Sequence, residues 1–364
     1  YNNDVASENY LNAGGNYEMS LRRLSQWVGT VNESIVPYSK ADDSISNGID
    51  SSYAYGYDTA HLKNAYRINI KTQPDAVKEQ IMEHGAVGIM YSHSYDGCNY
   101  LNDSYYDTSS MNGYGHAVMV VGWNDDYSKD NFKNGTKPAN NGAWLVRNSW
   151  GEGSSFDYFW MSYETYSLKD AAWVFDMSAV DEYDNNYQLD GSLETGIDQY
   201  YTQAANVFTV EEKANVESET LKAVSLSFLK TADVEYTVEV YTDLKDKYNP
   251  ASGTKSASTS GRTSYAGYYT IPLDKEVELK PGSSYAVVLK TDKKAIEYEY
   301  TYSTQVDIKD PASPIVWERA ASNNYDVDKT SFYYGYGKYG VSPNSNYRIK
   351  AFTTNNYAKT DSEY

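Results

Sequence analysis

The hydrophobic pattern of this chain changes its period near residue 183, and this change limits the possible folds more than any other feature. Before it, two short stretches with helical spacing lie between strand-like runs. After it, short alternating strands follow one another with turn residues between them, as in the run Val234, Val238 and Val240. We therefore expect an α+β domain followed by an all-β jelly roll or sandwich, with the boundary near residues 178–186.

Two helices are expected in the first half. Leu21, Leu24 and Val28 recur at helical spacing, and Gly29 is placed to end that helix. The second helix is expected over residues 74–82, before Gly85. Strands are expected at residues 66–70, 86–91, 116–123, 143–148 and 158–163, with polar loops at residues 39–64 and 92–114.

The charge of the chain argues against two classes of partner. Its 364 residues carry 50 acidic and 31 basic side chains, which gives a net charge of −19. Nucleic acid and anionic lipid surfaces bind patches of Lys and Arg, so we expect neither as a partner. No run of 18 apolar residues is present, so the sequence predicts no membrane span.

Cys98 is the only cysteine, which excludes an intrachain disulfide. Large secreted eukaryotic proteins usually carry several disulfides, so the count indicates either a cytosolic protein or an exported bacterial one. The chain begins at Tyr1 without a signal-like segment. We expect it to be a processed or excised piece of a longer protein.

Two apolar segments each carry a residue suited to thiol chemistry. Residues 115–123 read GHAVMVVGW, with His116 at the start of a strand, and residues 144–151 read WLVRNSWG, with Asn148 at the end of another. A thiol nucleophile works as a thiolate, so it needs a His to take its proton and a third group to orient that His. If the strands are antiparallel neighbours, Asn148 can accept a hydrogen bond from His116, and Trp150 can cover that bond.

One His at a strand start is more often a structural residue, but the two segments together favour a catalytic pair. They resemble the His and Asn segments of papain-family (C1) cysteine peptidases. The similarity extends over residues 14–163 and includes NSWG at 148–151, which is the most specific match. Further similar stretches are residues 11–15 (LNAGG), 36–38 (VPY), 85–87 (GAV) and 158–160 (YFW).

The resemblance implies a role for each matching residue. His116 and Asn148 would be catalytic, and no metal or other cofactor would be required. Substrate binding would involve Gly14, Gly15, Tyr17, Gly115, Ala117 and Trp150. In the family, the position of Gly15 offers backbone hydrogen bonds to an extended peptide. The positions of Tyr17 and Ala117 flank the pocket for the side chain two residues before the scissile bond, and that of Trp150 lies on the leaving-group side.

The second half resembles the lectin-like domain that follows the peptidase in some bacterial surface cysteine peptidases. Residues 204–208 (AANVF), 221–224 (LKAV) and 349–353 (IKAFT) carry this weaker similarity. It implies a cell-wall or carbohydrate ligand and, in some members, a structural calcium ion. Asp326 and Asp328 are candidate calcium ligands because hard cations bind several oxygens, although solvated loop carboxylates are the simpler interpretation.

The nucleophilic cysteine of the family is not found at its usual spacing. It precedes the His and Asn by roughly 130–150 residues, which places it before Tyr1, together with the oxyanion-hole Gln. Cys98 lies only 18 residues before His116, in a polar region, and we interpret it as a free loop thiol. His61, His84 and His93 are expected to be surface or loop residues.

We expect the nucleophile to come from a segment upstream of this chain. Either a Cys-bearing chain stays associated after cleavage, or this sequence begins after the segment, or the protein is a pseudo-peptidase. The upstream helix of the family is expected to cover the apolar residues Val87, Ile89, Val118 and Val120, which would otherwise lack a packing partner.

The sequence thus predicts a papain-like domain at 1–181, a lectin-like β-sandwich at 182–357 and a tail at 358–364. Its expected activity is peptide-bond hydrolysis in a protein substrate, in a secreted or surface-bound bacterial protein. The alternative is an inactive wall- or carbohydrate-binding protein built on a peptidase scaffold.

Overall fold

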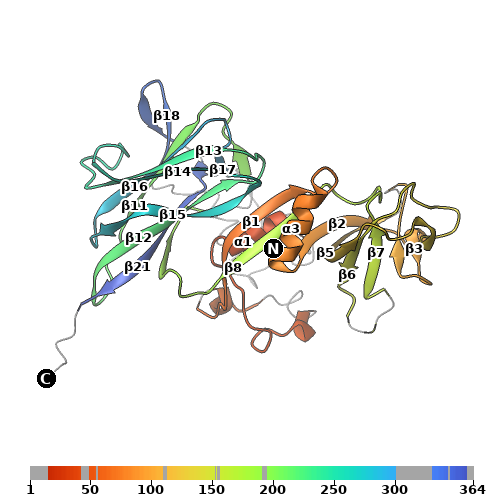
Figure 1. Cartoon of the computed structure of the whole chain (residues 1–364). Coiled ribbons are helices and arrows are strands. Elements are labelled where there is room, and N and C mark those ends of the chain that lie inside the picture. The colour runs from red at the N-terminus through yellow and green to blue at the C-terminus, as the bar shows by residue number, and fades with distance from the viewer. Residues whose placement is uncertain are drawn as a thin grey trace, which may run out of the picture. The chain divides into compact units, whose positions relative to one another are not determined.

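The computed structural model describes residues 15–41, 49–54, 56–109, 113–151, 153, 156–190, 195–300, 330–342 and 345–358. This part of the chain is mostly β-structure with two α-helices, as predicted (Figure 1). The chain forms two compact units. Unit 1 comprises Tyr1–Asn64 and Met177–Tyr364, and unit 2 comprises Ala65–Asp176. Strand β1 (His61–Asn69) begins in unit 1 and ends in unit 2.

The described part of unit 2 is a sheet with one helix. Its elements are α3 (Pro74–His84), β2 (Val87–His93), β3 (Cys98–Asn99), β4 (Ser104–Tyr105), β5 (Tyr114–Asn124), β6 (Ala143–Arg147), β7 (Tyr158–Ser162) and β8 (Ala171–Ser178), the last of which ends in unit 1. The strand order is β3-β4-β7-β6-β5-β2-β8. Strands β2, β5, β6 and β7 pair antiparallel, which holds the two predicted catalytic segments side by side.

Helix α3 has the ends that its terminal residues favour. Pro74 lies in its first turn, where the missing N–H costs no hydrogen bond. Gly85 follows in the left-handed conformation, with φ of 85°, and its N–H binds the carbonyl of Ile81. The helix therefore extends to His84, slightly beyond the predicted end, and lies next to β2 (Figure 1).

The two faces of strands β2 and β5 differ in burial. One face carries Val87, Ile89, Val118 and Val120, each at most 3% exposed. Through the register of β5, β6 and β7, the same face carries Val146 and Phe159, both 0% exposed. The prediction that the first four residues would lack a packing partner is therefore wrong, because they are buried within unit 2, where α3 contacts both β2 and β5. Ala117 and Met119 lie on the opposite face, which is exposed.

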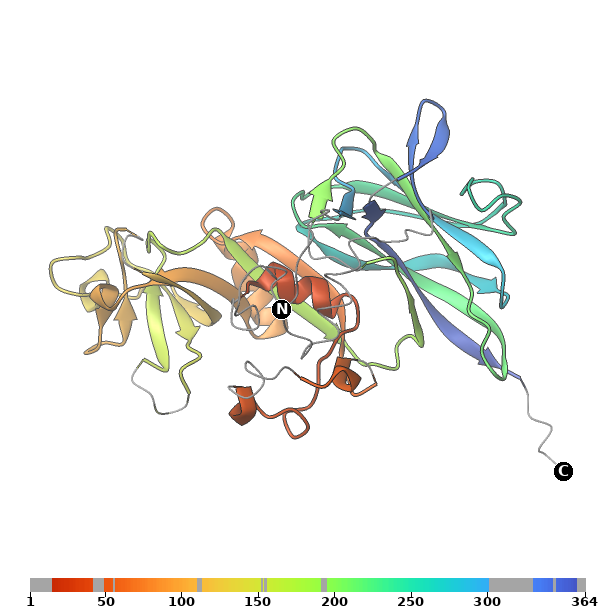
Figure 2. The same cartoon turned by 180° about the vertical axis from the view of Figure 1, so that it is seen from behind.

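The described part of unit 1 is a β-sandwich with one helix, α1 (Tyr17–Leu24). Its strands are β9 (Asn185–Tyr187), β10 (Thr195–Ile197), β11 (Gln203–Thr209), β12 (Val216–Phe228), β13 (Glu235–Thr242), β14 (Thr254–Arg262), β15 (Ala266–Leu279), β16 (Ser284–Thr291), β17 (Glu297–Tyr300), β18 (Ser331–Gly335), β19 (Lys338–Val341), β20 (Ser345–Tyr347) and β21 (Ile349–Tyr357). One layer has the order β15-β12-β21-β9, the other β14-β13-β16-β11-β18-β19, and β10-β17-β20 form a small third sheet. Figure 2 shows the layers from behind.

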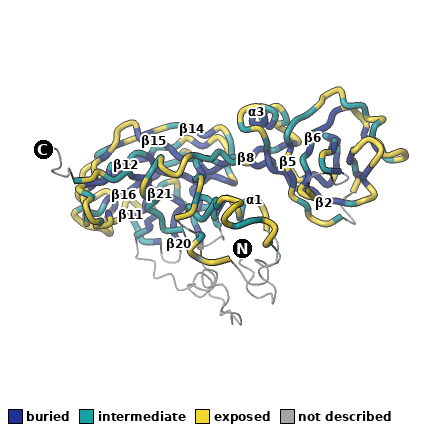
Figure 3. Tube along the Cα trace, turned by 90° about the horizontal axis from the view of Figure 1, so that it is seen from below, coloured by how far each residue is buried: buried dark blue, intermediate teal, exposed yellow. Residues whose placement is uncertain are grey.

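The core of unit 1 lies between the two layers. Leu226, Ile271 and Ile349 point into it from one layer, and Val238 and Val287 from the other. Figure 3 shows the buried residues along these strands in dark blue. The alternation of apolar and polar residues therefore predicted the sandwich correctly, because each strand has one face in this core.

Several boundaries differ from the predictions. Helix α1 ends at Leu24 rather than near Val28, and the chain then turns through Trp27 in a left-handed conformation, with φ of 60°. Strand β1 begins inside the predicted loop 39–64, and β3 and β4 lie inside the predicted loop 92–114. Strand β8 was not predicted. Neither of the two described helices is long and apolar enough to cross a membrane.

Candidate active site

The antiparallel pairing of β5 with β6 brings His116 and Asn148 together. Met119 lies opposite Arg147, so the start of β5 faces the residues that follow β6. The Nε2 atom of His116 lies 2.8 Å from the amide oxygen Oδ1 of Asn148. The two residues are 32 positions apart in the sequence, and only the strand register places them in contact.

The orientation of the Asn148 amide fixes the tautomer of the imidazole. Its Nδ2 donates to the carbonyl of Phe156 at 3.0 Å, and its Oδ1 accepts the N–H of Ser149 at 2.9 Å. The oxygen therefore faces His116, and Nε2 must be the donor in the hydrogen bond between them. This leaves Nδ1 of His116 as the ring nitrogen that can accept a proton. Asn148 is 5% exposed, which shields the hydrogen bond from water.

Trp150 lies against the same imidazole. Its ring is 5.6 Å from the His116 ring, centroid to centroid, at an interplanar angle of 26°. The indole is 36% exposed, so it covers the imidazole while part of it meets solvent. An apolar cover of this kind strengthens a hydrogen bond by lowering the local dielectric constant.

His93 belongs to this group, although it was predicted to be a surface or loop residue. It is 0% exposed, and its ring centroid lies 5.9 Å from that of His116 and 5.1 Å from that of Trp150. Its Nδ1 forms a hydrogen bond with the hydroxyl of Tyr91 at 2.8 Å, while its Nε2 has no hydrogen-bond partner among the described residues. Burial, and secondarily the charge of His116, lower the pKa of His93 to about 4. The alternation of β2, which puts residues 87, 89, 91 and 93 on one buried face, was the signal that could have revealed it.

The other two histidines have structural surroundings. His61 was also predicted at the surface, yet it is 7% exposed, stacks on Trp27 at 3.9 Å and contacts the Asp58 carboxylate. The side chain of His84, at the end of α3, is partly exposed and lies near Glu83.

Cys98 is the free thiol that the sequence predicted, but it is buried in a short strand rather than lying in a loop. It is 5% exposed, begins the short strand β3, and its sulfur lies 3.7 Å from the carbonyl of Ser94. Burial raises the pKa of the Cys98 thiol to about 11, and the hydrogen bond with Tyr100 only partly offsets this effect. A thiol in such surroundings stays protonated at neutral pH and is a poor nucleophile.

The remaining predicted site residues fall in three places. Gly115 and Ala117 lie on β5, where both are exposed, and Met90 lies directly opposite Ala117. Gly15 and Tyr17 lie in unit 1, at the start of α1. Residues 14, 326 and 328 lie outside the described residues. Within the described ranges, no group of three or more His, Cys, Asp or Glu side chains is arranged to hold a metal ion.

Two family models match adjoining parts of the chain. The papain family cysteine protease model matches residues 6–172, and the lectin-like domain model matches residues 187–353. The chain consists of a papain-family (C1) peptidase domain followed by a lectin-like domain. Both halves thus have the family character that the sequence indicated, and the His116–Asn148 pair lies in the papain-family half.

Known relatives share this organisation in part or in whole. Cathepsin S of Bos taurus is 32% identical over 120 residues, which are 29% of this chain and about a third (32%) of cathepsin S. A cysteine-to-alanine variant of the clostridial cysteine protease Cwp84, after propeptide cleavage, matches with a TM-score of 0.74 and 27% identity, over 94% of this chain and 82% of that chain.

A second structure contains the cysteine protease and lectin-like domains of Cwp84, which is a surface layer associated protein of Clostridium difficile. It matches with a TM-score of 0.70 and 27% identity, over 92% of this chain and 72% of that chain. The papain-family and lectin-like pair therefore occurs together in a solved relative.

Proposed function

We propose that this protein is a cysteine endopeptidase in which His116 performs the proton transfers and Asn148 orients its imidazole. The observation that carries the proposal is the 2.8 Å hydrogen bond from His116 Nε2 to Asn148 Oδ1, which leaves Nδ1 as the base. The membership of residues 6–172 in the papain family supports a peptide bond as the target.

The proposed reaction has two covalent steps. A thiol gives its proton to Nδ1 of His116, and the thiolate sulfur attacks the peptide carbonyl carbon. The imidazolium then gives that proton to the leaving amine as the C–N bond breaks, which leaves a thioester on the enzyme. Water hydrolyses the thioester with His116 as general base, and the thiol is regenerated. Asn148 keeps the imidazole in the required tautomer throughout.

We propose that the nucleophilic thiol comes from a cysteine upstream of Tyr1 rather than from Cys98. The burial and raised pKa of Cys98 support this assignment. The exposed face of β5, with Met119 46% exposed beside Ala117, supports a further segment packing there. Such an apolar surface favours burial by roughly 25 cal/mol per Å².

Ala117 is proposed to line the pocket for the substrate side chain two residues before the scissile bond. Met90 is its cross-strand partner on the same face, so we extend that proposal to Met90. By analogy with the surface-layer association of Cwp84, we propose a bacterial cell-surface location, with the lectin-like domain binding cell-wall or carbohydrate material.

The test is hydrolysis of a fluorogenic protein substrate by the complete enzyme, including its upstream segment. We expect thiol-dependent turnover that His116→Ala abolishes and that His84→Ala leaves unchanged. If the complete protein binds cell-wall preparations but shows no turnover with any of a broad peptide library, the scaffold alternative replaces the peptidase proposal.

A further inference from the structure

Helix α1 is too short to be stable by itself. It has eight residues, and isolated helices of that length do not form in water. Its conformation must therefore come from tertiary contacts. Although α1 belongs to the papain-family match, the contacts described below all join it to strands and loops of the lectin-like half of unit 1.

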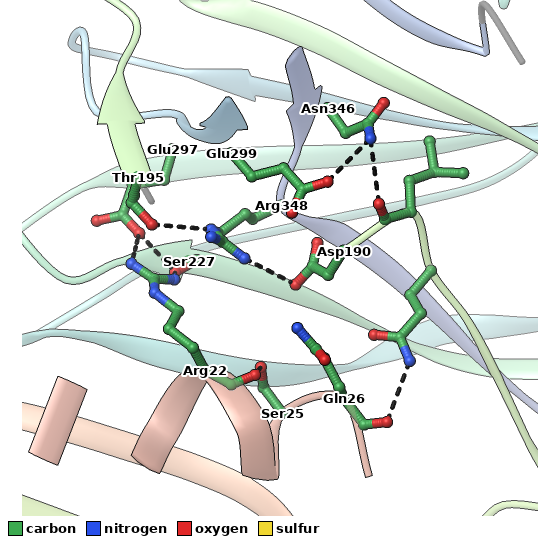
Figure 4. A network of polar contacts seen from close by, with 12 residues as sticks. Arg22, Ser25, Gln26, Asp190, Thr195, Ser227, Glu297, Glu299, Asn346 and Arg348 are labelled. Carbon is green, nitrogen blue, oxygen red and sulfur yellow. Dashed lines mark hydrogen bonds and ion pairs between the residues drawn. The ribbon is translucent and has the colours of Figure 1, made fainter. Parts of the chain in front are cut away.

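The centre of α1 is tied to the lectin-like sheet by a buried ion pair. Arg22 is 1% exposed, and its guanidinium donates to Glu297 Oε2 at 2.8 Å and to Ser227 Oγ at 2.9 Å. Ser227 in turn donates to the same Glu297 oxygen at 2.7 Å. Figure 4 shows Arg22 reaching from the helix to Ser227 and Glu297, and we call these three residues the Arg22 network.

Both ends of the helix are held by the same half of the chain. In the first turn, Glu18 accepts from Lys230 Nζ at 2.6 Å. At the other end, the carbonyls of Ser25 and Gln26 accept the side-chain amides of Asn186 at 3.4 Å and Gln188 at 3.1 Å. Ser25 is the C-cap of α1, so its carbonyl is among the groups that a helix end leaves without internal partners, and Gln26 follows it directly.

The contacts continue deeper into the sandwich. Gln188 also accepts Lys350 Nζ at 2.6 Å, and Lys350 donates to Asp190 at 2.6 Å. Asp190 accepts a further hydrogen bond from Arg348 at 3.1 Å. Burial raises the pKa of Asp190, but Lys350 and Arg348 together outweigh this effect and lower it to about 2, so this carboxylate is ionised inside the domain. An ionic arrangement of this kind has few alternative geometries, because every misplacement leaves a buried charge unpaired.

We propose that the lectin-like domain acts as a positioning element for the peptidase, and that the Arg22 network is the contact through which it acts. Holding α1 fixes Tyr17, the first residue of the helix, and Gly15, which precedes the N-cap Asn16. Those two residues are expected to bind the extended substrate, so the inference rests on the proposed function. Arg22 and Glu297 are positioning residues and take no part in the chemistry.

The test compares Arg22→Met with wild type in the complete enzyme. Three quantities are measured: hydrogen exchange of the amides of residues 20–25, kcat and KM for a peptide substrate, and the Kd of an extended peptide aldehyde. We expect exchange in α1 to accelerate at least about tenfold, and KM and Kd to rise by about tenfold or more, with kcat changed less than about threefold. Glu297→Met combined with Arg22→Met should restore part of the loss, because a buried ion pair can be replaced by apolar groups.

The control is Arg262→Met, which removes an exposed ion pair with Asp233 from the same domain and should change none of the three quantities. Faster exchange in α1 with unchanged KM and Kd would overturn the inference, and so would unchanged exchange. If wild type shows no turnover, the peptidase proposal fails, while exchange and aldehyde binding still decide the inference. If Arg22→Met does not fold, Glu18→Gln decides it, with the same expected direction and a smaller effect.

Discussion

In unit 2, His116 and Asn148 are joined by a hydrogen bond beside an exposed sheet face, whereas in unit 1 Arg22 and Glu297 form a fully buried ion pair. The first arrangement leaves a ring nitrogen open to a reacting group. In the second, the two charges neutralise each other in the interior, and neither is available to bind a substrate. The comparison teaches that hydrogen-bonded polar pairs in this chain serve two purposes. A pair with a partly exposed member can take part in chemistry, whereas a fully buried pair stabilises the fold.

The largest expected effect is on stability, in unit 1. Glu297→Gln leaves Arg22 without its main counter-charge, and we expect the free energy of unfolding to fall by about 3 kcal/mol. This is the lower end of the usual range because Glu18 remains 3.6 Å from the guanidinium. Urea denaturation measures it, with the exposed Glu278→Gln as matched control. Equal stability of the two variants would show that the Arg22–Glu297 pair does not stabilise unit 1.

His116→Ala should reduce activity rather than stability. We expect the kcat/KM of the complete enzyme to fall at least about 10²-fold, because the thiol loses its proton acceptor. Because the imidazole is partly exposed, unfolding by urea should change little. Normal turnover by this variant would show that His116 is not the base.

His93 should make unit 2 sensitive to acid. Its pKa is 6.5 in its unperturbed state and about 4 in the fold, so the unfolded chain binds the extra proton between these values. Stability should therefore be unaffected above pH 6.5 and should fall as the pH drops toward 4, by at most about 3 kcal/mol. Thermal unfolding of wild type and His93→Phe between these pH values tests it. An identical pH dependence in both proteins would contradict the assignment.

Asn148→Ala should reduce kcat/KM by about tenfold, less than His116→Ala, because Asn148 orients the imidazole without taking the proton. Steady-state kinetics on both variants, with circular dichroism to verify folding, provides the comparison. A larger loss in Asn148→Ala than in His116→Ala, with folding intact, would require the two roles to be exchanged.

Cys98→Ser should have the smallest effect. The thiol is buried and protonated, so we expect unchanged kcat and KM in the complete enzyme. Loss of thiol-dependent activity in a folded Cys98→Ser protein would make Cys98 the nucleophile.

Much of the fold and of the His116–Asn148 site could be predicted from the local hydrophobic pattern of the sequence. The apolar segments around His116 and Asn148 predicted two strands, and family resemblance implied their pairing. The alternation in residues 234–240 predicted the sandwich. These features depend on residues close in sequence, where period and end residues determine the structure.

Most features that the sequence did not predict depend on contacts between distant residues. His93 is an exception, because the alternation along β2 already places it on the buried face, and Cys98 lies in a short strand that pairs with the nearby β4. The Arg22 network joins residues 275 positions apart, and a single Arg on a short helix carries no signal of a distant partner. The residues that follow α1 are likewise bound by distant side chains, since the amides of Asn186 and Gln188 bind the carbonyls of Ser25 and Gln26.

The most direct test of the central claim is to treat the complete enzyme with a peptide epoxide and locate the adduct by mass spectrometry. We predict one adduct, on a cysteine upstream of Tyr1, formed at a rate that falls strongly in His116→Ala and not in Cys98→Ser. An adduct on Cys98, or labelling of the upstream cysteine at the same rate without His116, would contradict the account.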